Sequence, residues 1–302
     1  MRKLLFFVLL LSTITCTRTI AKIVGGSSVI SGFYPDITFQ VALTTDDNIL
    51  CGGVIVDEFW ILTAAHCVSD LPTGRIVNPT KINFVTGTNL NVVQSHPGEN
   101  VWVHPSYKQN VAVENRVDLA LVRLATPLIF NSFVGSIKLP RTVTTSPPPS
   151  DYIVSGYGTT KSTTSGQSII STSLLHVSVP YVDLATCNAA APFVVASKSI
   201  CAGGIEGEDS CQGDSGGPLI INFGTEITPD FVLAGIVSSG TATRNPLCAV
   251  ASEFGIYVDV KRNIEWIDSV MDGARGPNVS NASLSAVSIG IVILTVFVAI
   301  MI

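Results

Sequence analysis

Short apolar runs alternate with turn-forming residues through most of the chain. The runs are rich in Val, Ile, Leu and Thr, and stretches of Gly, Pro, Asn and Ser separate them. They predict strands at residues 39–43, 53–56, 60–64, 82–86, 120–124, 153–155, 173–179 and 232–237. Many short strands separated by turns are typical of an all-β barrel or sandwich.

Two segments depart from this strand pattern. The run from Lys161 to Ser173 is rich in Ser, Thr and Gly, which predicts an exposed loop. Near the end of the body, apolar residues recur at helical spacing and predict a helix that packs on the core. These residues are Val260, Ile264, Ile267 and Met271.

The first residues have the pattern of a secretory signal peptide. Arg2 and Lys3 precede an apolar run from Leu4 to Leu11, which is too short to span a bilayer. We expect the signal peptide to occupy residues 1–21, with a very short pro-segment that ends at residue 22. One compact domain at residues 23–272 then accounts for the body of the chain.

The last residues predict attachment to a membrane. Residues 286–302 are almost wholly apolar and follow a small, polar stretch, so residues 273–302 read as a linker and a hydrophobic tail. This combination indicates a GPI-anchor signal with its attachment residue between 273 and 282. A direct membrane span and another processed or buried tail are the alternatives. Asn278 and Asn281 begin glycosylation sequons.

Charge and cysteine content narrow the class of protein. The chain has 17 basic and 22 acidic residues and no basic run, so nothing indicates nucleic-acid binding. Of seven cysteines, Cys16 falls in or beside the signal segment. An even number remains, which in a secreted chain implies disulfides, with 15 possible pairings. A metal site is the alternative, but no C-x-x-C spacing supports it. The six are Cys51, Cys67, Cys187, Cys201, Cys211 and Cys248.

The stretch from Asp209 to Pro218 carries the candidate chemistry. Ser215 lies between Gly213-Asp214 and Gly216-Gly217, in a sequence that also fits an ordinary Gly-rich turn. A serine hydroxyl is a poor nucleophile at neutral pH and needs a base and an anion-stabilising pocket. The serine is therefore a candidate nucleophile only if such partners exist elsewhere in the chain.

The candidate base is one of four histidines. His66 follows an apolar run and small residues, whereas His96 and His104 precede prolines in loop-like contexts. His176 lies in an alternating strand pattern and is expected to face solvent. The candidate carboxylate is Asp118, which opens an apolar strand where an unpartnered acid would be costly to bury.

Four motifs together resemble the trypsin/chymotrypsin-like serine proteases, in the family's order and at its rough spacing. They are Ile23–Gly26, Thr63–Cys67, Asp118–Leu121 and Gly213–Pro218. The resemblance covers about residues 23–271. It implies an all-β fold of two six-stranded antiparallel barrels with the active site in the cleft between them, followed by a C-terminal helix.

The resemblance also implies a catalytic triad. His66 would be the general base and then the general acid, Asp118 would hold its tautomer, and Ser215 would be the nucleophile. The backbone N–H groups of Gly213 and Ser215 would form the oxyanion hole. Ser238 matches a serine that supports the buried aspartate, although it also fits a plain strand position.

A specificity pocket is implied in the same way. Asp209 matches an acid at the pocket floor, and Gly240 and Gly255 match wall positions where glycine keeps the pocket open. A carboxylate there selects a cationic side chain, so cleavage after Lys or Arg is expected. Ser239 stands where the family commonly has tryptophan, which leaves the extended subsite preference open.

Activation by cleavage is the last implication. Lys22 precedes Ile23, whose freed α-ammonium would insert and pair with Asp214. Because Lys22 fits the expected specificity, the precursor could activate itself. The family register pairs the cysteines as Cys51–Cys67, Cys187–Cys201 and Cys211–Cys248.

The sequence therefore predicts a serine endopeptidase that acts on protein or peptide substrates. The alternative is a catalytically silent homologue that acts as a binding or inhibitory protein. No cofactor, metal or nucleic acid is expected, and no compelling calcium loop is present. We expect a secreted monomer that is anchored at the cell surface.

Overall fold

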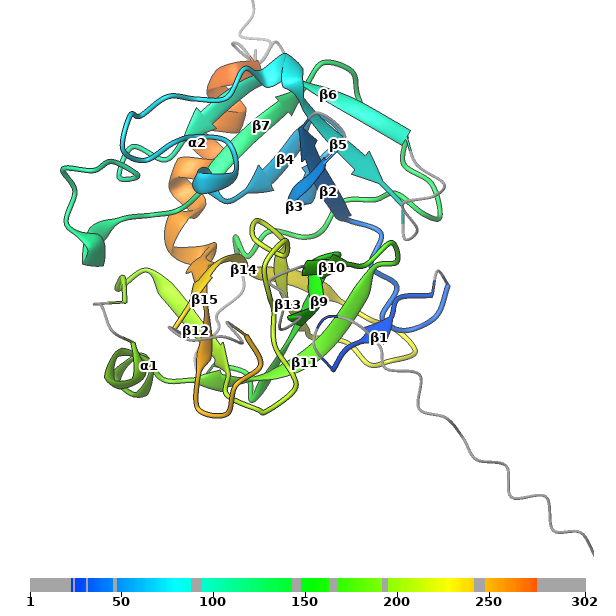
Figure 1. Ribbon diagram of the computed structural model, residues 1–302. Helices are drawn as coiled ribbons and strands as arrows, with labels where there is room; N and C mark the ends of the chain where they lie inside the picture. The colour runs from blue at the N-terminus through cyan, green and yellow to red at the C-terminus, as the bar shows by residue number, and fades with distance from the viewer. Residues whose placement is uncertain are drawn as a thin grey trace, which may run out of the picture.

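The computed structural model describes residues 23, 25–30, 32–45, 48–87, 94–142, 148–162, 168–191, 195–241 and 248–275. These residues form two β-barrels that lie one beside the other, with a helix along the first (Figure 1). The predicted signal peptide and hydrophobic tail lie outside the described residues. Among the residues that are described, no helix is both long and apolar enough to cross a membrane.

The first barrel is a closed antiparallel sheet in the order β2-β3-β4-β7-β6-β5. In β5, Ile82 and Phe84 are buried and alternate with half-buried residues, as expected when one face of a strand lines a core. The strands are β2 (Gln40–Thr45), β3 (Asn48–Asp57), β4 (Trp60–Thr63), β5 (Ile82–Thr86), β6 (Gln94–Val103) and β7 (Ala120–Leu124).

The second barrel is closed by the pairing of β13 with β8 and of β8 with β11. The short β1 (Ser27–Ser28) adds to the outside of β11, which ties the N-terminal segment to this barrel. The barrel strands are β8 (Asp151–Gly156), β11 (Leu175–Val182), β12 (Ser199–Gly203), β13 (Pro218–Asn222), β14 (Phe231–Gly240) and β15 (Phe254–Asp259).

Two α-helices and four short 3₁₀ turns complete the described fold. The helix α1 (Leu184–Ala190) is capped at its N-terminus by Asp183, whose side chain accepts a hydrogen bond from the Thr186 N–H at 2.9 Å. The helix α2 (Ile264–Arg275) buries Ile267 and Met271 against the first barrel (Figure 1). The 3₁₀ turns are η1 (Ala65–Cys67), η2 (Pro79–Lys81), η3 (Val113–Asn115) and η4 (Lys261–Asn263).

The two barrels are joined by hydrogen bonds between buried polar groups. Gln40 of the first barrel donates to the Ser155 carbonyl at 3.0 Å and accepts from the Ser155 hydroxyl. The Gly52 N–H donates to the carbonyl of Ser215 at 2.7 Å. Gly216 has φ +83°, and a Cβ there would collide with Thr63 and the Gly52 carbonyl. Only glycine therefore fits directly after Ser215 at this junction.

The structure confirms the fold expected from the sequence, with two six-stranded barrels and a C-terminal helix. The loop prediction for residues 161–173 was wrong in part. β9 (Thr159–Ser162) and β10 (Ser168–Ile170) pair there as a two-stranded sheet. β-Branched threonines suit such strands as well as they suit loops.

The predictions for three histidines were wrong in part. His96 lies in β6, where it pairs with Phe84, and not in a loop. His104 is buried, because the ring of Trp266 from α2 packs on it at a centroid distance of 4.9 Å. His176 lies in β11 as expected but is half-buried. All three errors come from tertiary contacts that a local pattern does not contain.

Candidate active site

His66 and Asp118 meet at the edge of the first barrel. β4 ends just before η1, which carries His66, and Asp118 lies two residues before β7, the neighbour of β4. The imidazole Nδ1 lies 2.7 Å from Asp118 Oδ2, and the His66 backbone N–H donates to Oδ1 at 2.9 Å. Both carboxylate oxygens are thereby fixed against one residue, which sets the orientation of the imidazole ring.

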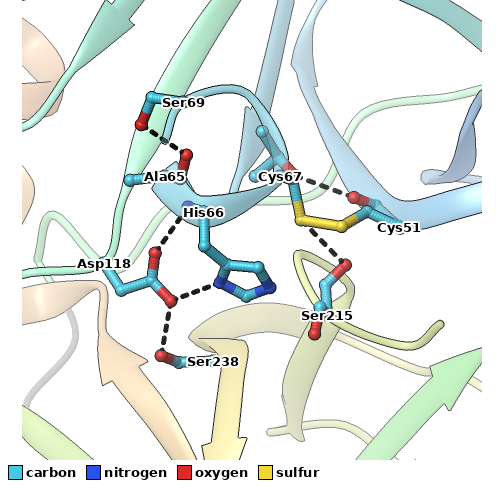
Figure 2. The surroundings of a disulfide bond; sticks show 10 residues. Cys51, Ala65, His66, Cys67, Ser69, Asp118, Ser215 and Ser238 are labelled. Atoms are coloured by element: carbon cyan, nitrogen blue, oxygen red, sulfur yellow. Dashed lines mark hydrogen bonds and ion pairs between the residues drawn. A yellow bond between two sulfur atoms is a disulfide. The ribbon is translucent and has the colours of Figure 1, made fainter. Parts of the chain in front are cut away.

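Ser238 supports the same carboxylate from the second barrel. Its hydroxyl donates to Asp118 Oδ2 at 2.6 Å, so this oxygen accepts two side-chain hydrogen bonds (Figure 2). The side chain of Asp118 is 15% exposed and that of His66 is 35% exposed. Asp118 is thus largely shielded from water, while part of the imidazole remains open to a substrate.

The contacts of the pair shift both pKa values toward the charged forms. Burial opposes charge on His66, but the hydrogen bond and the negative charge of Asp118 outweigh it and raise the imidazole pKa. Burial likewise opposes ionisation of Asp118, but His66 and Ser238 outweigh it and lower the carboxyl pKa. Asp118 is therefore ionised at neutral pH and stabilises a proton on the imidazole.

Ser215 reaches this pair from the loop that precedes β13. In Figure 2 the imidazole lies between Asp118 on one side and Ser215 on the other. The Ser215 carbonyl accepts from Gly52 and lies 3.7 Å from the Cys67 sulfur, which itself lies within 4.8 Å of a ring nitrogen of His66. The backbone of Ser215 is thereby held against the element that carries His66.

The sulfurs of Cys51 and Cys67 gather with His66 in a group that could suggest a metal site. The two sulfurs are joined in a disulfide, with their Cα atoms 6.1 Å apart. Neither sulfur is a thiolate, and a thiolate is the form that binds a metal. This group is therefore a structural clamp that ties η1 to β3.

Asp214 is fully buried beneath the Ser215 loop. Its carboxylate accepts the N–H groups of Gly158 and Cys211, each at 2.8 Å, and no ion pair of the described residues includes it. Burial raises its pKa to about 6, although the two hydrogen bonds oppose the shift. Ile23 is fully buried in the core of the same barrel. Lys22 lies outside the described residues.

A pocket of about 220 Å³ opens next to Ser215 in the second barrel. Asp209 lines it and is 6% exposed, and Ser210 donates its backbone N–H to the carboxylate at 2.7 Å. Burial raises the pKa of Asp209 to about 7 against the hydrogen bonds from Ala249 and Ser210. The remaining lining residues are Ser210, Cys211, Gln212, Ser215, Val237, Ser238, Ser239, Gly240, Cys248, Glu253, Phe254 and Gly255.

Glycines shape the pocket and the adjacent loop. Gly240 and Gly255 are partners across β14 and β15, so both lie on one wall. A Cβ on Gly255 would lie 2.6 Å from the Tyr257 hydroxyl, whereas one on Gly240 would meet, in the part of the chain that the structure describes, only the Phe254 carbonyl, at 3.5 Å. Gly213 has φ +93°, a conformation that favours glycine.

Most residues singled out in the sequence fall into two adjoining groups. His66, Asp118, Ser238 and Ser215 form one, and Asp209 with the two wall glycines forms the other, sharing Ser215 and Ser238 with the first. The cysteines pair as the resemblance implied. The disulfides are Cys51–Cys67, Cys187–Cys201 and Cys211–Cys248.

Two features of the site were missed from the sequence. Glu253 lines the pocket, and the pair of Gln40 with Ser155 joins the barrels beneath it. Glu253 lies two residues before the wall residue Gly255, and this proximity was the one sign in the sequence that Glu253 would line the pocket. Nothing in the sequence relates Gln40 to Ser155, because 115 residues separate them.

Comparison with known proteins identifies similar chains. A family model described as Trypsin matches residues 23–267. Coagulation factor IX of Cavia porcellus is 35% identical over 255 residues, which cover 81% of this chain and 80% of that protein. Transmembrane protease serine 11C of Mus musculus is 32% identical over 268 residues, or 86% of this chain.

A third relative is transmembrane protease serine 9 of Rattus norvegicus, which is 32% identical over 252 residues, or 83% of this chain. The matched region spans 22% of that protein and 57% of the mouse protein. The chain is therefore similar to only part of the length of each of these two transmembrane proteases.

Proposed function

Because the chain belongs to the trypsin family of serine proteases, we propose that it is an endopeptidase that cleaves peptide bonds after Lys or Arg. One observation carries the proposal. Asp209 is almost fully buried and lines the pocket that also contains Ser215. A buried carboxylate favours a cationic partner, because an uncharged side chain would leave it desolvated and unpaired.

In the proposed reaction, Ser215 attacks the carbonyl carbon of the bound Lys or Arg residue, the carbon of the peptide bond that is cleaved. His66 takes the hydroxyl proton and then gives it to the leaving amine, while Asp118 keeps Nδ1 protonated and stabilises the imidazolium. An acyl-enzyme forms, and water activated by His66 hydrolyses it. The 2.7 Å contact between His66 and Asp118 supports these roles.

The backbone N–H groups of Gly213 and Ser215 would stabilise the oxyanion of the tetrahedral intermediate. Losing one such donor in related sites costs about 3–4 kcal/mol of transition-state stabilisation. The positive φ of Gly213 supports the assignment, because a side chain would strain the backbone where a donor is needed.

We also propose that the chain is made as a precursor and cut after Lys22. The freed α-ammonium of Ile23 would then pair with Asp214, which is fully buried and, among the described residues, accepts only from backbone N–H groups. Gly25 lies against Gly207 in the loop that leads to Asp209, so a change at the N-terminal segment could reach the pocket.

Activity against matched substrates tests the proposed reaction. The chain prepared from Ile23 should hydrolyse peptide amides that end in Arg or Lys and leave the matched Phe and Leu amides intact. A Ser215→Ala variant should be inactive and should resist labelling by a serine-directed organophosphate. A properly cut chain that neither hydrolyses substrate nor takes the label would instead be a silent homologue with a binding role.

The proposed location is the cell surface. The basic and apolar start of the chain supports secretion, and the apolar residues 286–302 support a GPI anchor, with a direct membrane span as the alternative. Two relatives are named transmembrane proteases. Release of the protein from intact cells by a phosphatidylinositol-specific phospholipase would support GPI, and retention would support a peptide anchor.

A further inference from the structure

Glu253 brings a second carboxyl group to the pocket that contains Asp209. It directly precedes β15, after a turn in which Ser252 has φ +63°. Its backbone N–H donates to the Val250 carbonyl at 3.1 Å, so the residue has a defined position beside the wall strand. Both Glu253 and Asp209 line the same cavity.

The carboxyl oxygens of these two residues differ in their hydrogen bonds. Asp209 Oδ1 accepts from Ser210 at 2.7 Å, and Oδ2 lies 3.5 Å from the Ala249 N–H. Glu253 Oε2 is buried and has no hydrogen-bond partner in the described part of the chain. Leaving a buried acceptor unsatisfied destabilises the protein, and more so when the acceptor is charged. A donor that reached this oxygen would remove this cost.

We propose that Glu253 is a second acceptor for the cationic side chain of the substrate and makes the pocket prefer Arg to Lys. This inference rests on the function proposed above. A guanidinium group presents five N–H donors in a rigid plane, so one edge can face Asp209 while another faces Glu253. A Lys ammonium is a compact, strongly hydrated charge with three donors, and it can satisfy one carboxylate without reaching the other.

The pocket has room for this arrangement. Its cavity has a volume of about 220 Å³, and at the wall residue Gly240 a Cβ would meet no described atom nearer than the Phe254 carbonyl, at 3.5 Å. The base of the wall is also rigid, because the Phe254 N–H donates to the Thr241 hydroxyl at 2.8 Å and the Thr241 N–H donates to the Phe254 carbonyl at 2.9 Å. Glu253 is thus held next to a fixed strand.

The test uses two peptide amides that differ only in Arg or Lys at the cleaved bond. In a Glu253→Gln variant, kcat/KM for the Arg substrate should fall by about tenfold, as expected for loss of a charge-assisted hydrogen bond. The value for the Lys substrate should fall by less than about threefold, because an ammonium reaches Asp209 alone. A Glu206→Gln variant is the matched control, since Glu206 is exposed in the loop before Asp209 and does not line the pocket.

Two outcomes would overturn the inference. One is an equal loss for both substrates, which would indicate a general structural or charge effect of Glu253. The other is no change in either rate, which would mean that solvent or a bound ion satisfies the orphaned oxygen. If the Glu253→Gln variant does not fold, a Glu253→Asp variant replaces it in the test. Glu253→Asp keeps the charge but shortens the side chain by one methylene, and it should also lower the ratio of kcat/KM for the Arg substrate to that for the Lys substrate.

The same measurements separate this inference from the proposed function. If the unaltered chain from Ile23 cleaves neither substrate, the proposed function fails. If it cleaves both and Glu253→Gln leaves their ratio unchanged, only the inference fails. Calorimetric binding of arginine amide and lysine amide to the Ser215→Ala chain gives a readout without turnover, in which Glu253→Gln should weaken the arginine ligand selectively.

Discussion

Cleavage after Lys22 should reverse the contribution of Asp214 to the pH dependence of folding stability. In the uncut chain its carboxyl group is fully buried, has no ion pair among the described residues, and has its pKa raised from 3.8 to about 6. A group with a raised folded pKa adds stability that is fully present below its unfolded pKa and is lost as pH rises through its folded pKa. The stability that Asp214 contributes in the uncut chain is therefore lost between about pH 4 and about pH 6.

The magnitude follows from the size of the shift. The difference between 3.8 and about 6 in the pKa of Asp214 corresponds to about 3 kcal/mol of unfolding free energy. In the chain that begins at Ile23, the new α-ammonium would pair with the carboxylate and lower its pKa. Ionised Asp214 would then stabilise the fold at neutral pH, and that stability would be lost on acidification.

The assay compares urea unfolding of two proteins in a Ser215→Ala background, which prevents self-cleavage. One begins at Ile23 and the other retains the preceding residues. We subtract the unfolding free energy of the longer protein from that of the protein that begins at Ile23. This difference should rise by about 3 kcal/mol or more between about pH 4 and pH 7.5. Asp209 also has a raised pKa, but it is present in both proteins and cancels in the difference.

An Asp214→Asn substitution in both proteins is the control, because it removes the titrating group and should make the two pH profiles parallel. Parallel profiles without the substitution would refute the reasoning. They would show either that Asp214 already has a cationic partner before cleavage or that the new terminus does not reach it.

Three further predictions concern the reaction itself. The contact with Asp118 raises the pKa of His66 above 6.5, and activity should fall as the pH drops through this pKa, because a protonated imidazole cannot accept the hydroxyl proton. A profile of kcat/KM against pH would show the pH at which activity is lost. Ser238→Ala removes the 2.6 Å bond to Asp118 and should lower kcat by about tenfold with KM little changed, measured by steady-state kinetics. Gly240→Val should place methyl groups in open pocket space and reduce turnover of Arg and Lys amides by more than about tenfold, while the melting temperature stays unchanged.

The residues proposed to carry the chemistry could be predicted because each stands in a distinctive local motif. His66, Asp118 and Ser215 were identified from the order of four motifs, and the strands at 82–86 and 120–124 from runs of Val, Ile and Leu. The helix α2 followed from its apolar spacing, and Ile267 and Met271 are indeed buried.

Elements whose stability comes from distant partners could not be predicted. β6 has a polar sequence with a proline, and it is a strand because β5 and β7 pair with it on both sides. The position of Glu253 beside the pocket depends on the path of several segments around one cavity. The helix α1 was also missed, although Asp183 before an Ala-rich run is a recognisable N-cap.

The bond from the Gly52 N–H to the Ser215 carbonyl joins the two barrels at the candidate site, so the proposed proteolysis would require both barrels to be assembled. Ser215 and His66 belong to different barrels, so a half-folded chain with one barrel complete would have the proposed nucleophile without its base, or the base without the nucleophile. If the chain is the protease proposed above, it would therefore not cleave its neighbours while it is still folding. The architecture would supply a safeguard that is independent of the proposed cleavage after Lys22.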